Sequence, residues 1–280
     1  MSAKCVMRAG EFMRKSILLV DKEVNAEKMG YSIPWNSEAA GFNMHFPETA
    51  ININADAETN WINKLGNPEE ITAIFIECPL EKIEYHILDK MSNIEQIYIS
   101  NAAELDSIDF VSHKAKLKDL CVSDSKISDL NPLVELMKYQ SNLVEKYPEE
   151  FLTYQLQNVA ITGASISDLS CFNGFDGSIS DLNLQDNSIS DLKPLDKLDI
   201  YYANFSHNQI IDIEDFMKTH GCTYLMNFRK NKIKSIGFMN DWVNAFPRRF
   251  FIGGNLFTDY SPLKGWHFVQ SDIPMNTKFI

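Results

Sequence analysis

The sequence has few glycines and prolines and no long apolar run. Its 12 Gly and 10 Pro among 280 residues are too few for a low-complexity or fibrous chain. The longest apolar run near the start, Ile17 to Val20, stops at Asp21 and is shorter than a signal peptide or a membrane helix requires. We therefore expect neither an export signal nor a membrane anchor.

Cysteine is also scarce. The five cysteines are odd in number, lie far apart and form no CxxC pair, so no disulfide framework or zinc site is encoded locally. This pattern predicts a reducing, cytoplasmic location. The cysteines are Cys5, Cys78, Cys121, Cys171 and Cys222.

Basic residues are outnumbered by acidic ones. The chain has 26 Lys and Arg against 38 Asp and Glu, which gives a formal net charge of -12. Such a surface repels phosphate groups overall. We therefore expect neither nucleic acid nor an anionic membrane as a partner.

Motifs for catalysis and for cofactor binding are missing. Gly253-Gly254 is followed by Asn255 rather than a phosphate-binding GK[ST] ending, and GxGxxG and GxSxG do not occur. The six histidines form no HExxH or HxH pair, and His220-Gly-Cys222 offers only two metal ligands. The sequence predicts no cofactor, no metal and no enzymatic activity.

What the sequence does contain is a repeat. Units start at residues 71, 94, 117, 156, 179, 200, 223 and 247, so the intervals run from 21 to 24 residues apart from one of 39. Apolar residues recur at unit positions 1, 4, 6, 11 and 14, as in Leu117, Leu120, Val122, Ile127 and Leu130. One unit has no closed core of its own, so the units must stack.

Two polar positions repeat with the same period. Position 9 carries asparagines that can bond backbone groups in a turn, and position 13 carries aspartates that suit turn caps. We interpret both sets as structural. They are Asn187, Asn208, Asn231 and Asn255, and Asp129, Asp168, Asp191, Asp212 and Asp259.

Over about residues 71 to 263 this pattern resembles the short subclass of leucine-rich repeats, near LxxLxLxxNxIxDLxxL, as in bacterial internalins. The resemblance implies an α/β solenoid with a curved parallel sheet on its concave face and short helices or turns on its convex face, and it favours a bacterial origin. Pro79, Ala102, Ser125 and Ala164 depart from the pattern, because each replaces the turn asparagine.

Three domains are expected. Residues 1–66 form an N-terminal cap, with a strand over 14–20, a short helix over 23–29 and extended chain over 42–53. Trp61, Ile62 and Leu65 would cover the first repeat. Residues 67–263 form the repeat domain of about eight repeats, with a helical insertion at 134–155 whose second helix starts at Pro148. Residues 264–280, with Trp266 and Phe268, form a C-terminal cap.

The candidate binding surface is the concave sheet, because outward side chains at positions 2, 3, 5, 7 and 8 escape the core requirement. Tyr and Arg in the last three units are the residue types that most often dominate interfaces. A rival interpretation is that these tyrosines only cover aliphatic stems and that the charges are solvated. The candidate protein-binding residues are Tyr98, Asp119, Asp181, Asn183, Tyr202, Asn204, Tyr224, Asn227, Arg229, Arg249 and Phe251.

The pattern favours a noncatalytic, monomeric protein-interaction module that binds a protein partner through the concave face. One alternative is a cytoplasmic immunity or inhibitor protein whose acidic centre blocks a basic toxin or enzyme. A further alternative is an enzyme with a site in the N-terminal region, which a cleft joining His45 or His86 to Cys5 or a carboxylate would favour.

Overall fold

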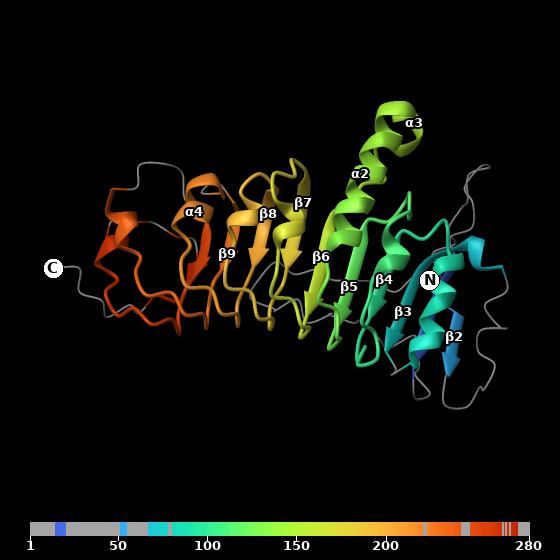
Figure 1. The fold of residues 1–280 in the computed structure, drawn as a ribbon, viewed down its shortest axis with the longest axis horizontal. Helices are drawn as coiled ribbons and strands as arrows, with labels where there is room; N and C mark the ends of the chain where they lie inside the picture. The colour runs from blue at the N-terminus through green and yellow to red at the C-terminus, as the bar shows by residue number, and fades with distance from the viewer. Residues whose placement is uncertain are drawn as a thin grey trace, which may run out of the picture.

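The computed structural model describes residues 15–20, 51–54, 67–77, 80–220, 223–241, 247–264, 266, 268 and 270–273. Eleven strands in these ranges form one parallel sheet in the order β11-β10-β9-β8-β7-β6-β5-β4-β3-β1-β2. The helix expected over 23–29, and Trp61, Ile62 and Leu65, lie outside the described residues. Figure 1 shows the strands of successive repeats side by side, in chain order from β3 to β9.

Each repeat contributes one strand, and neighbouring strands pair at equal unit positions. Leu120 lies opposite Val159, and Leu182 lies opposite Ala203, which are all position 4 of their units. The frame that the sequence predicts is therefore confirmed. The strands of the eight repeats are β3 Ile71–Glu77, β4 Gln96–Ile99, β5 Asp119–Ser123, β6 Asn158–Thr162, β7 Ser178–Asn183, β8 Asp199–Asn204, β9 Leu225–Asn227 and β10 Arg249–Phe251. After the last repeat, β11 Gln270–Ser271 pairs with β10.

The first described segments extend the same sheet. Strand β1 (Lys15–Val20) pairs with β3 on one side and with β2 (Ile51–Asn54) on the other. The strand expected over 14–20 is thus confirmed, and β2 lies at the end of the segment expected to be extended. The division into an N-terminal cap, a repeat domain and a C-terminal cap stays a prediction.

The hydrophobic core lies between the sheet and the returning segments. Positions 1, 4, 6, 11 and 14 are buried in the units that start at 117, 156, 179 and 200. Phe205, Phe228 and Phe250 are fully buried in the C-terminal units and follow one another across adjacent coils, with ring centroids 6.1 and 6.3 Å apart. Stacking of coils therefore builds one continuous core, as repeat architectures require.

The chain returns to the next strand through short helices. Each of the five position-13 aspartates accepts a hydrogen bond from the backbone N–H two residues later, at 2.8 to 2.9 Å. Their predicted role as turn caps is confirmed. The returns are η2 Pro68–Glu70, η3 Lys82–Lys90, η4 Asp109–Val111, η5 Ser170–Phe172, η6 Lys193–Leu195, α4 Glu214–His220, η7 Gly237–Asp241 and η8 Ser261–Leu263.

The insertion between the units at 117 and 156 holds helices α2 (Asn131–Lys146) and α3 (Pro148–Phe151). The first helix begins three residues before the expected segment, directly after the turn in which Asp129 accepts a hydrogen bond from the Asn131 N–H. In Figure 1, α2 leans out from the row of coils, so that α3 stands at the tip. None of the described helices is both long and apolar enough to cross a lipid bilayer.

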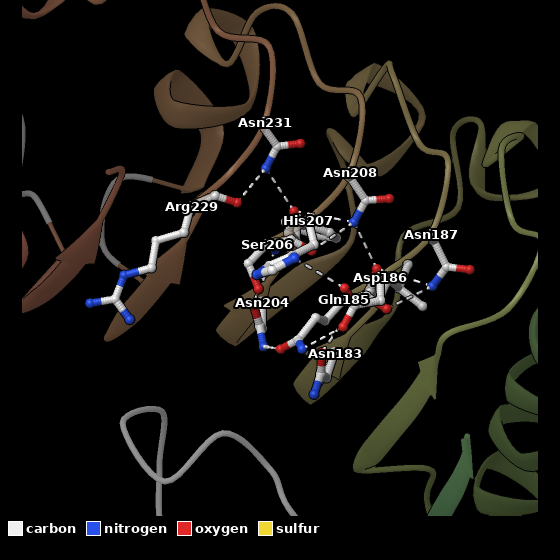
Figure 2. Close-up of polar contacts among 12 residues, drawn as sticks. Asn183, Gln185, Asp186, Asn187, Asn204, Ser206, His207, Asn208, Arg229 and Asn231 are labelled. Carbon is white, nitrogen blue, oxygen red and sulfur yellow. Dashed lines mark hydrogen bonds and ion pairs between the residues drawn. The ribbon is translucent and has the colours of Figure 1, made fainter. Parts of the chain in front are cut away.

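A ladder of asparagines joins the C-terminal coils (Figure 2). Asn208 donates to the carbonyl of Leu184 in the preceding coil at 2.8 Å and accepts from the Ile189 N–H of that coil at 2.9 Å. It also donates within its own turn to the carbonyls of Phe205 and Ser206. Asn187, Asn231 and Asn255 repeat the contacts with the preceding coil. The structural role predicted for these four residues is confirmed.

The residue before each ladder position has an unusual backbone. Position 8 has a positive φ, between 52 and 74°, in the seven units from 94 to 247. This left-handed region strains most side chains and suits Gly, Asn and Asp. The residues are Asn101, Asp124, Gly163, Asp186, His207, Lys230 and Gly254. Position 8 was predicted only to lie on the outward surface, because Asn, Asp, Gly, His and Lys at this position share no apolar pattern that would indicate its backbone requirement.

Candidate protein-binding surface

Side chains at positions 3 and 5 point away from the core and form two rows across the sheet, which we call row 3 and row 5. The strand register places equal positions opposite each other from β4 to β10. Row 3 contains Gln96, Asp119, Asn158, Asp181, Tyr202, Leu225 and Arg249, and row 5 contains Tyr98, Cys121, Ala160, Asn183, Asn204, Asn227 and Phe251. Nine of the eleven predicted binding residues lie in these rows, and Tyr224 and Arg229 lie beside them.

Row 5 does not escape burial. Its seven members are between 1% and 8% exposed. Asn183, Asn204 and Asn227 each accept a hydrogen bond from the backbone N–H two residues later, at 3.1 to 3.2 Å, and so fix the ends of their strands. The structure therefore gives these asparagines a local structural task, while their part in binding stays a prediction.

The first carboxylate of row 3, Asp119, is well supplied with donors. Asp119 accepts from the Gln96 amide at 2.7 Å and from the Asn158 amide at 2.5 Å, one on each neighbouring strand. The Tyr98 hydroxyl also bonds to it, and burial, followed by the charge of Asp119, raises the pKa of Tyr98 well above its usual value. These contacts hold the Asp119 carboxylate in place.

Asp181 lies two strands further along row 3 and has a different environment. It is only 7% exposed, yet among the described residues no side chain or backbone group bonds its carboxylate. Burial, followed by the charge of Asp119, raises the pKa of the Asp181 carboxyl to about 7. A buried carboxyl group without a donor is costly to ionise, and such groups gather at functional sites.

The C-terminal part of the face carries a group of aromatic and basic side chains that we call the Tyr-Arg patch. It consists of Tyr201, Tyr202, Tyr224, Arg248 and Arg249. The rings of Tyr201 and Tyr224 stack with centroids 5.5 Å apart, and Tyr202 meets both edge-on. The guanidinium groups of Arg248 and Arg249 lie 5.8 and 5.6 Å from the Tyr224 ring centroid.

Two members of this patch were absent from the sequence-based candidates. Tyr201 is 51% exposed and Arg248 is exposed, and both occupy position 2, next to the predicted binding residues Tyr202 and Arg249 at position 3. The signal was present, because position 2 is Tyr, Tyr and Arg in the three consecutive units at 200, 223 and 247. What the sequence could not indicate was the stacking of Tyr201 on Tyr224 between adjacent coils.

Two other candidates have partners within the chain. Arg229 Nε bonds Asp272 at 2.6 Å, and its guanidinium lies 4.3 Å from the centroid of the Phe251 ring. Asp272 also accepts from the backbone N–H groups of Ile252 and Gly253, at 2.8 and 3.0 Å. Arg229 and Phe251 thus help to join the last described residues to the sheet.

Groups with possible catalytic chemistry are held in structural settings. Burial raises the pKa of Cys121 to about 12 and that of Cys171 to about 11, so neither thiol is an activated nucleophile. His220 is buried and its Nε2 lies 2.7 Å from the Leu198 carbonyl. Over the described ranges, no cluster of three His, Cys, Asp or Glu side chains could hold a metal. His86 is exposed beside Asp89, and His45 and Cys5 lie outside the described residues.

These elements define the fold as an α/β leucine-rich repeat solenoid. Among solved structures it is similar to an internalin C2 from Listeria monocytogenes, with 17% identity over 72% of this chain and 81% of that chain and a TM-score of 0.50. Another internalin of the same organism has 17% identity over 80% of this chain and 72% of that one, with a TM-score of 0.48. No family model matches the sequence, and no curated protein matches it significantly.

Proposed function

We propose that this chain is a noncatalytic protein-interaction module that binds a protein partner through the outward face of its sheet. The observation that carries the proposal is the Tyr-Arg patch: three tyrosines in mutual ring contact and two arginines from three consecutive coils, with Tyr201 51% exposed. Tyr and Arg are the residues most often dominant in interfaces, because they combine large apolar area with polar groups.

The rest of the face supports a protein partner over a small molecule. Row 5 is buried and its three asparagines bond their own turns, whereas row 3 carries amide, carboxylate, phenol and guanidinium groups between β4 and β10. An extended array of this kind suits a broad, charged surface, whereas small-molecule sites need deep concave pockets. The -12 net charge would speed capture of a basic partner.

The test is affinity capture from the lysate of the native host, at low and moderate salt, with bound proteins identified by mass spectrometry. The informative variant is Tyr201→Ala with Arg248→Glu, because both side chains are exposed and neither supports the core. The matched control is Ile211→Ala with Lys234→Glu, which changes the same residue classes on the exposed return segments. We expect the first variant to capture at least tenfold less of the partner than the original protein does. The control variant should capture as much as the original protein. Equal capture by both variants would reject the patch.

A second candidate function is that of an inhibitor or immunity protein, in which the acidic centre blocks a basic toxin or enzyme. Asp181 and Asp119, two strands apart in row 3, favour it, because a basic partner would neutralise both. The captured protein itself separates the two functions. An inhibitor should abolish the activity of its partner when the two are mixed at equal concentration, whereas a scaffold should leave that activity unchanged.

A further inference from the structure

The two carboxylates of row 3 differ in a way that points to a missing ligand. Asp119 has donors from both neighbouring strands and from Tyr98, whereas no described residue donates to Asp181, although it is the more buried of the two. They lie two strands apart on the same face, roughly 10 Å along the sheet. Burying a carboxylate without a donor costs stability, and each such group in a folded protein calls for an explanation.

The surroundings of Asp181 fit a cationic side chain. Asp119 on β5 adds a second negative charge, Asn158 on β6 is neutral, and Tyr202 on β8 offers an aromatic ring. Arg249 on β10 is the only cationic side chain in row 3. Its charge affects the pKa of Tyr202 but not that of Asp181. Asp181 keeps an exposed fraction of 7%, on the face of the sheet that points away from the core.

We propose that Asp181, flanked by Asp119, Asn158 and Tyr202, is the acceptor for an arginine or lysine side chain of the protein partner. The proposal rests on the proposed function and adds the chemistry of the partner to it. The incoming guanidinium or ammonium supplies the donors that Asp181 lacks, is attracted by Asp119, and packs beside the Tyr202 ring. A carboxylate cluster with fewer than three metal-binding side chains does not suit a divalent cation.

Binding of a cation to Asp181 is linked to its proton. The Asp181 carboxyl has a pKa of about 7, so it must lose a proton to receive the cation. Affinity therefore rises with pH, and is about tenfold higher at pH 8 than at pH 6. Of the neighbouring groups, Tyr202 has a raised pKa and stays protonated in this range, and Asp119 accepts hydrogen bonds from the amides of Gln96 and Asn158.

The direct test uses a short capped peptide with one arginine, and the same peptide with citrulline, which has the shape of arginine without its charge. Binding is followed by NMR on protein with ¹³C-labelled aspartate carboxyl groups. We expect the arginine peptide to shift the Asp181 signal, to lower its pKa, and to bind about tenfold more weakly at pH 6 than at pH 8. The citrulline peptide should leave the signal unchanged.

Two charge-matched variants complete the experiment. Asp181→Asn should lower the affinity for the arginine peptide at least tenfold. Asp199→Asn, which removes an exposed charge from β8, should bind the peptide as the original protein does. An arginine peptide that fails to shift Asp181, or that binds Asp181→Asn equally well, would overturn the proposal. Neither result decides whether the Tyr-Arg patch binds the partner, because the capture experiment with Tyr201→Ala and Arg248→Glu tests that separately.

A stability measurement remains informative if peptide binding is weak. The folded-state pKa of Asp181 lies above the unfolded value near 3.9, so the folded protein holds the proton more tightly and loses stability as the pH rises from about 4 to 7. Asp181→Asn removes this cost. The variant should melt about 4 °C or more above the original protein at pH 8, with less than half of that gain at pH 5. No gain at pH 8 would show that Asp181 already has a partner, and would overturn the proposal.

Discussion

The two halves of the repeat array hold their coils together by different means. From the unit at 179 onward, one asparagine in each turn bonds the preceding coil in the same way. In the units at 117 and 156 the ladder position is Ser125 and Ala164, so the repeated bond is lost. An asparagine at position 164 would accept a hydrogen bond from the Ile127 N–H. That N–H instead donates to the Ser125 hydroxyl at a long 3.4 Å.

The inserted helix supplies the replacement. Gln140 on α2 is 2% exposed, donates to the Leu117 carbonyl at 2.8 Å, and accepts from the Leu156 N–H at 2.8 Å. It therefore joins the first positions of the two coils between which the ladder is broken. The comparison teaches that what the fold needs is satisfied backbone groups between coils, and that either a periodic short amide or a single long one can provide them.

The largest expected effect comes from breaking the intact half. Asn208→Ala removes four hydrogen bonds and leaves the Ile189 N–H and the Leu184 carbonyl buried without this partner. We expect a loss of about 3 kcal/mol in the free energy of unfolding, measured by denaturant titration. Partner selection should not change, because the side chain is 3% exposed and lies in the turn. An unchanged midpoint would reject the structural role of the ladder.

Breaking the bridge in the other half should cost less. Gln140→Leu keeps most of the volume of the side chain but removes the amide that joins Leu117 and Leu156, and we expect a loss of about 2 kcal/mol. Glu145→Gln, on an exposed position of the same helix, is the control and should change stability by less than about 0.5 kcal/mol. Equal effects of the two substitutions would mean that α2 does not brace the coils.

The comparison can be sharpened by restoring the missing rung. Ala164→Asn places the ladder amide opposite the Ile127 N–H, and we expect a gain of about 1 kcal/mol in the free energy of unfolding. Ser165→Asn, one residue later on an exposed site, is the control and should give no gain. A loss of stability in Ala164→Asn would indicate that the coil spacing beside α2 cannot accept the ladder residue.

The smallest expected effect concerns the backbone of position 8. Lys230 has φ of 52°, and its side chain is exposed, so Lys230→Gly relieves left-handed strain without removing a buried group. We expect a gain of about 0.5 kcal/mol, visible as a higher melting temperature. Lys232→Gly, two residues later, serves as the control and should lower stability, because glycine there only adds freedom to the unfolded chain.

Periodic features could be predicted from the sequence, and features that join distant residues could not. The unit frame, the core positions, the asparagine ladder and the aspartate caps follow from residues that recur every 21 to 24 positions. The Gln140 bridge spans 23 residues to Leu117 and occurs once, and the contact of Arg229 with Asp272 spans 43. No periodic signal marks either contact. The sequence likewise placed Asp181 on the outward face, but its burial without a donor depends on neighbours from three strands.

The most direct test of the central claim is site-specific photo-crosslinking, which asks which face of the solenoid meets the partner. A benzophenone amino acid would replace Tyr201 on the outward face in one protein and Ile211 on a return segment in another, since both side chains are more than half exposed. We expect the partner identified by affinity capture to crosslink to position 201, and no protein to crosslink to position 211. Crosslinking from position 211 with none from position 201 would contradict binding through the outward sheet face.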